Sequence, residues 1–319
     1  MTSTLRLATR RSALATVQSG MVADAVRAVT GRPVDLVEIT TSGDTSQATQ
    51  VPMTQIGGTG VFVNALREAL LAGEADFAVH SLKDLPTAPP AGLALAAVPE
   101  REDVRDVLVA HGGRKLADLP AGARVGTGSA RRAAQLRLVR PDLEVVPVRG
   151  NVDTRVGFVS DGRLDGVVLA YAGLNRLGRI GEATDFFDPA EFLPAPGQGA
   201  LAIECRADDA ELLEILARLD HAPTRAAVVA ERALLATLEA GCSAPVGGYA
   251  LIGPGDGELT LSGLVAAVTG PEHEGAPEAV RGSLTGPVAQ AARIGADLAA
   301  RMLEQGADAL MAAVPRASS

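Results

Sequence analysis

The sequence is poor in cysteine and in long apolar runs, and each shortage excludes a class of protein. Only two of its 319 residues are cysteines, Cys205 and Cys242, which argues against a disulfide framework and predicts a reducing compartment. No run of about 18 apolar residues is present to form a membrane-spanning helix. The N-terminal segment is interrupted by arginines and does not look like a secretory signal. These shortages predict a soluble protein of the cytoplasm.

Charged and metal-binding residues exclude further classes. The formal net charge of −9 argues against non-specific binding of nucleic acid. The four histidines are too scattered for a zinc site, so no metal is expected. The glycine patterns of dinucleotide- and nucleotide-binding loops are missing, as is the Gly-x-Ser-x-Gly turn of a serine hydrolase.

Lysine is also scarce, because 27 of the 29 basic residues are arginine and only Lys83 and Lys115 are lysine. A guanidinium group binds a carboxylate or a phosphate through two parallel hydrogen bonds, which an ammonium group cannot do. The positions of the arginines are therefore informative about a ligand.

The first two thirds of the chain alternate short apolar runs with stretches of helical periodicity. Strands are expected at Leu5–Ala8, Leu36–Thr40, Phe77–His80, Leu93–Val98, Val107–Ala110, Arg124–Gly126, Leu143–Val148 and Gly166–Ala170. Helices are expected at Ala13–Val29, Val61–Ala72 and Arg131–Val139. This alternation predicts an α/β fold with mostly parallel sheets.

The rest of the chain predicts a return to the first lobe and a small additional domain. Helices are expected at Asp208–Leu219, Thr224–Leu238 and Val288–Gln305, and strands at Tyr249–Ile252 and Leu259–Val268. Polar and Pro/Gly junctions follow Pro99 and Pro194. We expect residues 1–99 with 200–219 to form lobe 1, residues 100–199 lobe 2, and residues 220–319 a small α/β C-terminal domain.

Arginines follow four of the expected strands, in the segments Ala8–Ser12, Gly126–Arg132, Arg149–Arg155 and Ala170–Arg176. Parallel α/β sheets bind ligands at the carboxyl ends of their strands. The pattern therefore predicts a basic cleft for a multiply charged anion, either a polycarboxylate or a polyphosphate.

Two other segments contain residues that could react. Lys83 and Asp84 follow the expected strand Phe77–His80, and a carboxylate in a cleft can assist a leaving group or stabilise a cation. Cys242 lies in a turn rich in Gly, Ser and Pro, where a thiol can be reached and activated by cationic neighbours. A surface ion pair and a buried structural cysteine are the plainer alternatives.

Taken together, these segments make the chain resemble the porphobilinogen deaminase family, also called hydroxymethylbilane synthases. The matching pieces follow the family order: Ala8–Ser12, Gly57–Gly60, Ala78–Asp84, Gly126–Arg132, Arg149–Asn151, Pro196–Gly199 and Glu239–Cys242. Gln55 and Thr59 depart from the family pattern, which often has lysine there, and Ser42 stands where arginine is common.

The resemblance implies two lobes like those of type II solute-binding proteins, plus a small domain with the cysteine. It implies a transferase of haem and tetrapyrrole biosynthesis that adds four porphobilinogen units head to tail, with loss of ammonia. It also implies a dipyrromethane cofactor joined to Cys242 by a thioether, a linear tetrapyrrole, hydroxymethylbilane, as the product, and a monomer that binds no nucleic acid or membrane.

The resemblance further implies a role for each site residue. Asp84 corresponds to the catalytic acid and also contacts the cofactor. The other cofactor-binding residues are Cys242, Lys83, Thr127, Ser129, Arg131 and Arg132. The substrate-binding residues are Arg10, Ser12, Arg149, Arg155 and Arg176.

Two other functions would use part of the same pattern. A non-catalytic binding module explains the arginines but leaves Cys242 and Asp84 without a chemical role. A transferase that uses a free thiol explains Cys242 but has no evident partner histidine.

Overall fold

The computed structural model describes residues 3–39, 61–241, 244–255, 257–267 and 279–312. By its internal contacts the chain divides into two compact units. Unit 1 comprises Met1–Glu102 and Ala200–Arg225, and unit 2 comprises Asp103–Gly199 and Ala226–Ser319.

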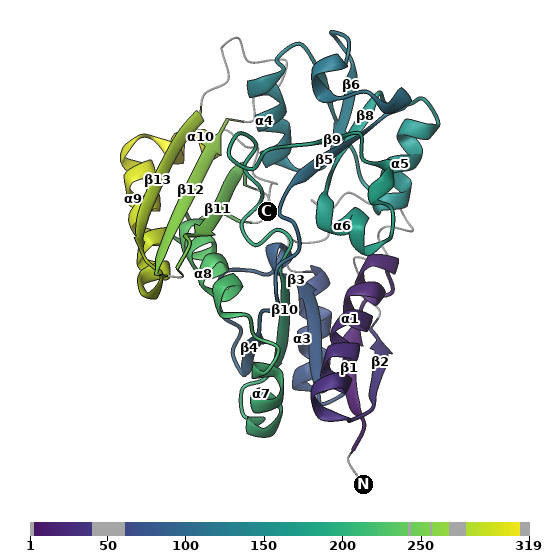
Figure 1. Ribbon diagram of the computed structural model, residues 1–319, viewed down its shortest axis with the longest axis vertical. Helices are drawn as coiled ribbons and strands as arrows, with labels where there is room; N and C mark the ends of the chain where they lie inside the picture. Colours follow the sequence, from purple (N-terminus) through teal and green to yellow (C-terminus); the bar gives the residue numbers. More distant parts are fainter. Residues whose placement is uncertain (1–2, 40–60, 242–243, 256, 268–278, 313–319) are drawn as a thin grey trace. The chain divides into compact units, whose positions relative to one another are not determined.

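Unit 1 is built on one five-stranded sheet (Figure 1). In spatial order its strands are β2 (Val34–Glu38), β1 (Leu5–Thr9), β3 (Phe77–Ser81), β10 (Leu201–Arg206) and β4 (Leu93–Ala97). Strand β1 runs parallel to β2 and β3, while the returning strand β10 runs antiparallel to β3 and β4. The segment after residue 200 thus completes the sheet that the N-terminal segment begins.

Helices cover both faces of this sheet, because alternate side chains of each strand point to opposite faces. On one face the buried Leu7, Phe77 and Ile203 belong to the same apolar core as residues of α1 (Ala13–Thr30) and α7 (Ala210–Ala217). On the other face, the small Ala8 and Ala78 leave room for Leu66 and Leu70 of α3 (Val61–Leu71).

The first sheet of unit 2 repeats this plan. Its spatial order is β7 (Glu144–Pro147), β6 (Arg124–Thr127), β8 (Gly166–Ala170), β5 (Asp106–Ala110) and β9 (Asp185–Phe186). Strands β7, β6 and β8 are parallel, and β5 is antiparallel to β8 and β9. Helix α4 (Ala130–Val139) contributes to the core on one face, and α5 (Val152–Ser160) and α6 (Tyr171–Arg176) contribute to the core on the other.

The C-terminal part of unit 2 has its own antiparallel sheet, made of β11 (Val246–Ile252), β12 (Glu258–Ala266) and β13 (Ala279–Pro287). Helices α8 (Ala222–Thr237), α9 (Ala291–Glu304) and α10 (Ala307–Ala312) share an apolar core with it. Helix α9 passes so close to α8 that a Cβ atom on Gly295 would lie 2.3 Å from the carbonyl oxygen of Ala230. Only glycine fits this contact.

The predicted fold class is confirmed: an α/β protein with two lobes and a small C-terminal domain. The predicted strands and helices agree with the described elements, with small shifts such as a β2 that begins at Val34 rather than Leu36. Six α-helices and strands among the described elements were not predicted, namely α5 and α6, β9 (Asp185–Phe186) and β10 (Leu201–Arg206), β13 and α10. Along the described part of the chain, no helix combines the length and apolar character needed to cross a membrane.

Candidate active site

The carboxyl ends of β1 and β3 lie at the same edge of the unit 1 sheet, because the two strands are parallel neighbours. Four predicted site residues follow these strands: Arg10, Ser12, Lys83 and Asp84. Helix α1 links the two strand ends, since the Nε2 atom of Gln18 donates a hydrogen bond to the Oγ atom of Ser81 at 3.1 Å. Ser12 caps this helix by accepting a hydrogen bond from the backbone N–H of Ala15 at 3.3 Å.

Lys83 and Asp84 belong to a short 3-10 helix, η2 (Leu82–Asp84), directly after β3. Leu82 fixes this turn, because its side chain is buried and its backbone N–H donates to the carbonyl oxygen of Ala200 at 3.0 Å. Asp84 is exposed and Lys83 half-buried. Asp84 is therefore exposed to solvent on a turn that the buried Leu82 anchors.

A buried ion-pair network lies in the sheet beside this turn. The Glu204 carboxylate of β10 accepts two hydrogen bonds from Arg67 of α3, at 2.9 and 2.7 Å, and lies 3.2 Å from the Nε2 atom of His80. Burial alone would raise the pKa of Glu204, but hydrogen bonds from His80 and Arg67 outweigh it and lower this pKa to about 2. Glu204 is thus a carboxylate that its two partners keep ionised in the protein interior.

In unit 2 the turn between β6 and α4 holds the predicted residues Thr127 and Ser129. The Oγ1 atom of Thr127 accepts from the backbone N–H of Ser129 at 3.2 Å, and the Ser129 hydroxyl caps α4 by accepting from the N–H of Arg132 at 3.4 Å. A Cβ atom on Gly128 would lie 2.6 Å from the carbonyl oxygen of Val148, so the turn needs glycine. The chain packs closely here, at the carboxyl ends of β6 and β7.

Arg131 and Arg132, in the first turn of α4, are buried rather than exposed, and both pair with Asp106 of β5. Asp106 is fully buried and accepts a further hydrogen bond from Gln198 at 2.8 Å. Burial alone would raise the pKa of Asp106, but the charges of Arg131 and Arg132, with hydrogen bonds from Arg132 and Gln198, lower it to about 2.

The other predicted arginines of unit 2 follow β7 and β8, the strands that flank β6. Arg149 is exposed. Arg155 is partly buried, donates from Nε to the carbonyl oxygen of Gly150 at 2.9 Å, and has its pKa lowered by burial and then by the charge of Arg132. Arg176 donates from Nη2 to the carbonyl oxygen of Gly199 at 2.7 Å. The structure thus gathers the predicted residues of unit 2 at the carboxyl ends of three parallel strands.

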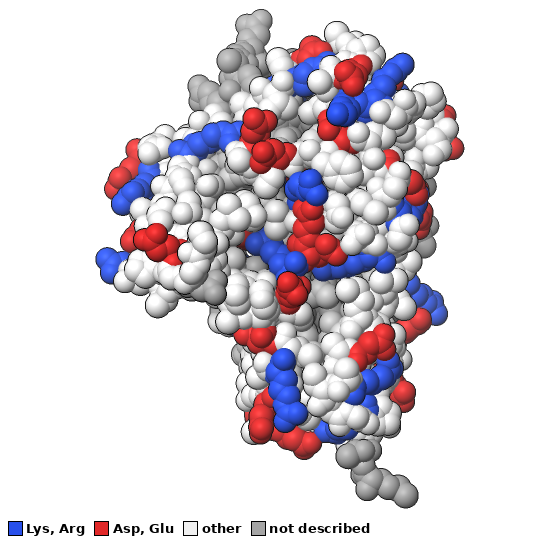
Figure 2. All heavy atoms as spheres, in the orientation of Figure 1, with Lys and Arg blue, Asp and Glu red and all other residues white. Residues whose placement is uncertain are grey.

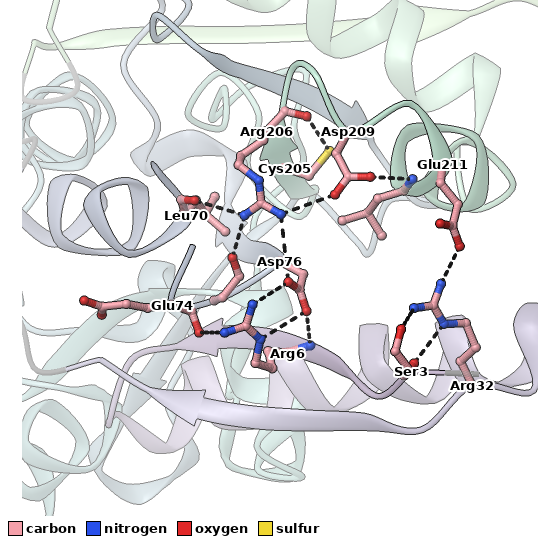
Figure 3. A network of polar contacts seen from close by, with 12 residues as sticks. Ser3, Arg6, Arg32, Leu70, Glu74, Asp76, Cys205, Arg206, Asp209 and Glu211 are labelled. Atoms are coloured by element: carbon pink, nitrogen blue, oxygen red, sulfur yellow. Dashed lines mark hydrogen bonds and ion pairs between the residues drawn. The ribbon is translucent and has the colours of Figure 1, made fainter. Parts of the chain in front are cut away.

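Of the two cysteines, Cys205 belongs to the described residues. Cys242 lies outside the described residues, as do Gln55, Thr59 and Ser42. Cys205 is fully buried in β10, and burial raises the pKa of its thiol to about 11. Its neighbour Arg206 donates to the backbone and pairs with Asp209, close to the Arg6–Asp76 pair (Figure 3). The high pKa of this thiol makes Cys205 a poor nucleophile.

The face of the molecule drawn in Figure 2 has no single dominant sign of charge. Figure 2 shows basic and acidic side chains interspersed over the visible face. Many of the surface arginines have acidic partners, such as Arg140 with Asp142 and Arg179 with Glu182. No group of three or more His, Cys, Asp or Glu residues that could hold a metal ion occurs within the described ranges.

Sequence reasoning missed three buried polar residues, Asp106, Gln198 and Glu204. A signal was available, because Asp106 begins an apolar strand and Glu204 interrupts one. An acidic side chain in such a strand is seldom left without a cationic partner.

The two low carboxyl pKa values predict acid-labile folding. A carboxylate whose pKa is lower in the folded than in the unfolded state stabilises the fold above its ordinary pKa and loses that effect as the pH falls toward the folded value. With ordinary pKa values of 3.8 and 4.5 and folded values of about 2, Asp106 should contribute about 2 kcal/mol and Glu204 about 3 kcal/mol at neutral pH. Thermal melts should show Tm falling steeply below about pH 4.5, with a smaller fall in a Glu204→Gln variant. An unchanged slope in that variant would contradict the assignment to Glu204.

Comparison with known proteins assigns the chain to a family. The family model described as "Porphobilinogen deaminase, dipyromethane cofactor binding domain" matches residues 5–214, and "Porphobilinogen deaminase, C-terminal domain" matches residues 225–304. Porphobilinogen deaminase 1 of Streptomyces coelicolor is 61% identical over 318 residues, which cover 96% of this chain and 97% of that protein. Porphobilinogen deaminase of Thermobifida fusca is 57% identical over 313 residues, covering 98% and 97%.

Among solved structures, the chain is similar to the VFT2 domain of Bordetella pertussis BvgS, as a double mutant. The TM-score is 0.41 and the identity 18%, over 68% of this chain and 86% of that chain.

The fold and the sequence matches first define the class, an α/β transferase of tetrapyrrole biosynthesis. The chain belongs to the porphobilinogen deaminase family. The activity expected from the sequence, that of a porphobilinogen deaminase, is thereby confirmed, and the larger matched region is a domain that binds a dipyrromethane cofactor.

Proposed function

We propose that this chain joins four porphobilinogen units head to tail on a dipyrromethane primer held by a thioether to Cys242. Each addition releases ammonia, and hydrolysis releases the linear product hydroxymethylbilane. When bound, the dipyrromethane supplies the free pyrrole carbon that forms the first new C–C bond.

The observation that carries this proposal is an excess of positive charge around the first turn of α4. Within the described residues, the ion pairs of Arg131 and Arg132 both go to one carboxylate, Asp106, and Arg155 lies near enough to Arg132 for the charge of Arg132 to lower the pKa of Arg155. Buried cations need anionic partners, so this cluster favours a ligand that brings carboxylates of its own. Each pyrrole ring has an acetate and a propionate side chain, and the dipyrromethane therefore fits the residues present.

We assign the binding roles from the resemblance to the porphobilinogen deaminase family. In unit 2, Thr127, Ser129, Arg131 and Arg132 bind the carboxylates of the cofactor, and in unit 1 Lys83 and Asp84 contact it. The substrate carboxylates bind Arg10, Ser12, Arg149, Arg155 and Arg176. Guanidinium groups suit this task because they form paired hydrogen bonds with each carboxylate.

Asp84 is the catalytic residue in this proposal. As the C–N bond of the substrate breaks and ammonia leaves, an azafulvenium-type cation develops on the substrate ring. The Asp84 carboxylate assists the departure and stabilises this cation beside the pyrrole nitrogen. Arginines and one carboxylate are compatible in the same reaction, because they act on opposite parts of the substrate.

A Cys242→Ala variant tests the attachment. The wild-type protein should have an intact mass above its sequence mass and should give a dipyrrole colour with acidic aminobenzaldehyde reagent before any substrate is added. Cys242→Ala should have the bare sequence mass, give no colour and form no product, because the thioether sulfur is gone.

The matched control is Cys205→Ala, which removes the other, fully buried sulfur. It should keep both the added mass and the colour. A coloured Cys242→Ala protein together with a colourless Cys205→Ala protein would move the attachment to Cys205.

We also propose that the chain is a monomer and acts in the cytoplasm. Sedimentation of the purified protein tests the oligomeric state. The proposed division is lobe 1 (1–99 with 200–219), lobe 2 (100–199) and a C-terminal domain (220–319). The separate apolar core of the C-terminal sheet supports the last of these.

A further inference from the structure

Asp106 stands out because one fully buried carboxylate contacts two buried guanidinium groups. Its Oδ1 atom accepts from Arg132 Nε at 3.0 Å and Nη2 at 2.7 Å, and its Oδ2 atom lies 2.7 Å from Arg131 Nη2. Each oxygen thus serves a different arginine, so two like charges are held side by side.

Backbone carbonyl groups fix the far side of each guanidinium. Arg131 donates from Nη1 to the carbonyl oxygen of Leu193 at 2.5 Å, and Arg132 donates from Nη1 to that of Val168 at 3.2 Å. The Nε atom of Arg131 is buried and has no hydrogen-bond partner among the residues that the structure describes. At least one N–H donor of the two arginines, the Nε–H of Arg131, is thus not used by Asp106 and can bind a ligand.

Gln198 fixes the carboxylate in turn. Its Nε2 atom donates to Asp106 Oδ1 at 2.8 Å and to the carbonyl oxygen of Val104 at 2.8 Å, and Gln198 is itself fully buried. The position of Asp106 is therefore set from its own strand and from the Pro/Gly turn before β10.

The charge of this cluster does not balance. Asp106 supplies one negative charge against the two positive charges of Arg131 and Arg132. Arg155 adds a third positive charge, and it lies near enough to Arg132 for the charge of Arg132 to lower the pKa of Arg155. With no carboxylate Arg131 and Arg132 would repel one another, and with two carboxylates this pair of arginines would have no net positive charge left for a ligand.

We propose that Asp106 is a positioning residue, which holds Arg131 and Arg132 in place before the cofactor arrives and leaves net positive charge for one cofactor carboxylate. This inference rests on the proposed function, because it takes the cofactor to be the ligand of these two arginines. Asp106 itself has no access to the reacting atoms, since it is fully buried.

The test compares Asp106→Asn with Asp106→Glu. Asparagine keeps the size of the side chain and removes the charge, whereas glutamate keeps the charge and adds a methylene. The fraction of folded chains with dipyrromethane, measured by intact mass, should fall at least tenfold in Asp106→Asn and be largely retained in Asp106→Glu. Circular dichroism identifies the folded fraction, and the Cys242 thiol of unloaded chains should titrate as free.

If Asp106 served packing alone, Asp106→Asn should load more cofactor than Asp106→Glu, because asparagine fits the site and glutamate is too large for it. Loading of Asp106→Asn at or above that of Asp106→Glu would overturn the proposal. If Asp106→Asn does not fold, Asp106→Glu decides alone: loading near that of wild type supports the proposal, and a folded protein without cofactor overturns it.

Asp142→Asn is the matched control, because Asp142 pairs with Arg140 on the surface of the same unit. It should load like wild type. Failure of the proposed function itself would appear separately, as wild-type protein that has no dipyrromethane.

Discussion

An Asp84→Asn variant is expected to lose roughly 10²- to 10⁴-fold in kcat while keeping its bound dipyrromethane. Asparagine has the same shape as aspartate but has no negative charge to stabilise a developing cation and cannot accept a proton. The loss should appear in kcat, because the missing interaction forms mainly as ammonia leaves.

The structure explains why the variant should remain folded. Asp84 is exposed at the end of η2, and the turn is fixed by the buried Leu82 rather than by the carboxylate. Single-turnover release of ammonia measures the chemical step, and intact mass measures the cofactor.

Asp118→Asn is the matched control, because Asp118 is also exposed at the last position of a three-residue 3-10 helix, η4 (Leu116–Asp118). It should turn over like wild type. Product formation by Asp84→Asn within a few-fold of wild type would remove Asp84 from its catalytic role.

A Glu204→Ala variant is expected to destabilise unit 1 by about 3–5 kcal/mol, which corresponds to a fall in Tm of roughly 10 °C. The substitution removes the carboxylate that pairs with Arg67 and His80, and it leaves a guanidinium that is 13% exposed without its anion. An uncompensated buried charge costs more than the loss of the pair itself.

Glu211→Ala is the control for this prediction, because Glu211 also pairs with an arginine of unit 1, Arg32, at 2.8 Å (Figure 3). Its side chain is 77% exposed, so its loss should change stability by about 1 kcal/mol or less. In the double variant Glu204→Leu/Arg67→Met, apolar packing should recover part of the loss. Equal melting temperatures for Glu204→Ala and Glu211→Ala would contradict the prediction.

The regular elements were predictable where the periodicity of apolar residues is strong. Strand β5 and helix α1 agree with the predicted ranges within one residue at each end. Strand β5 is an apolar run that is buried throughout, and α1 buries residues at helical spacing. Helix α5 was missed because its nine residues include glycine and have little amphipathic character. Strand β13 was missed because it alternates exposed and half-buried residues and has no buried position.

The site residues were predictable to the extent that they follow parallel strands. Arg10, Asp84 and Arg132 follow β1, β3 and β6, as the sequence pattern predicted, and their part in binding a ligand stays a prediction. The partners of the arginines were not predictable, because they depend on tertiary contacts. Arg67 pairs with Glu204, 137 positions later in the chain, and no local sequence pattern predicts that contact.

Strand β10 has a consequence for synthesis of the protein on the ribosome. It lies between β3 and β4, yet it follows them in the chain by about a hundred residues or more. The nascent polypeptide therefore cannot close its first sheet until residue 206 has emerged, and until then β3 and β4 expose unpaired backbone edges. The protein is thus most vulnerable to aggregation while the second lobe is being translated.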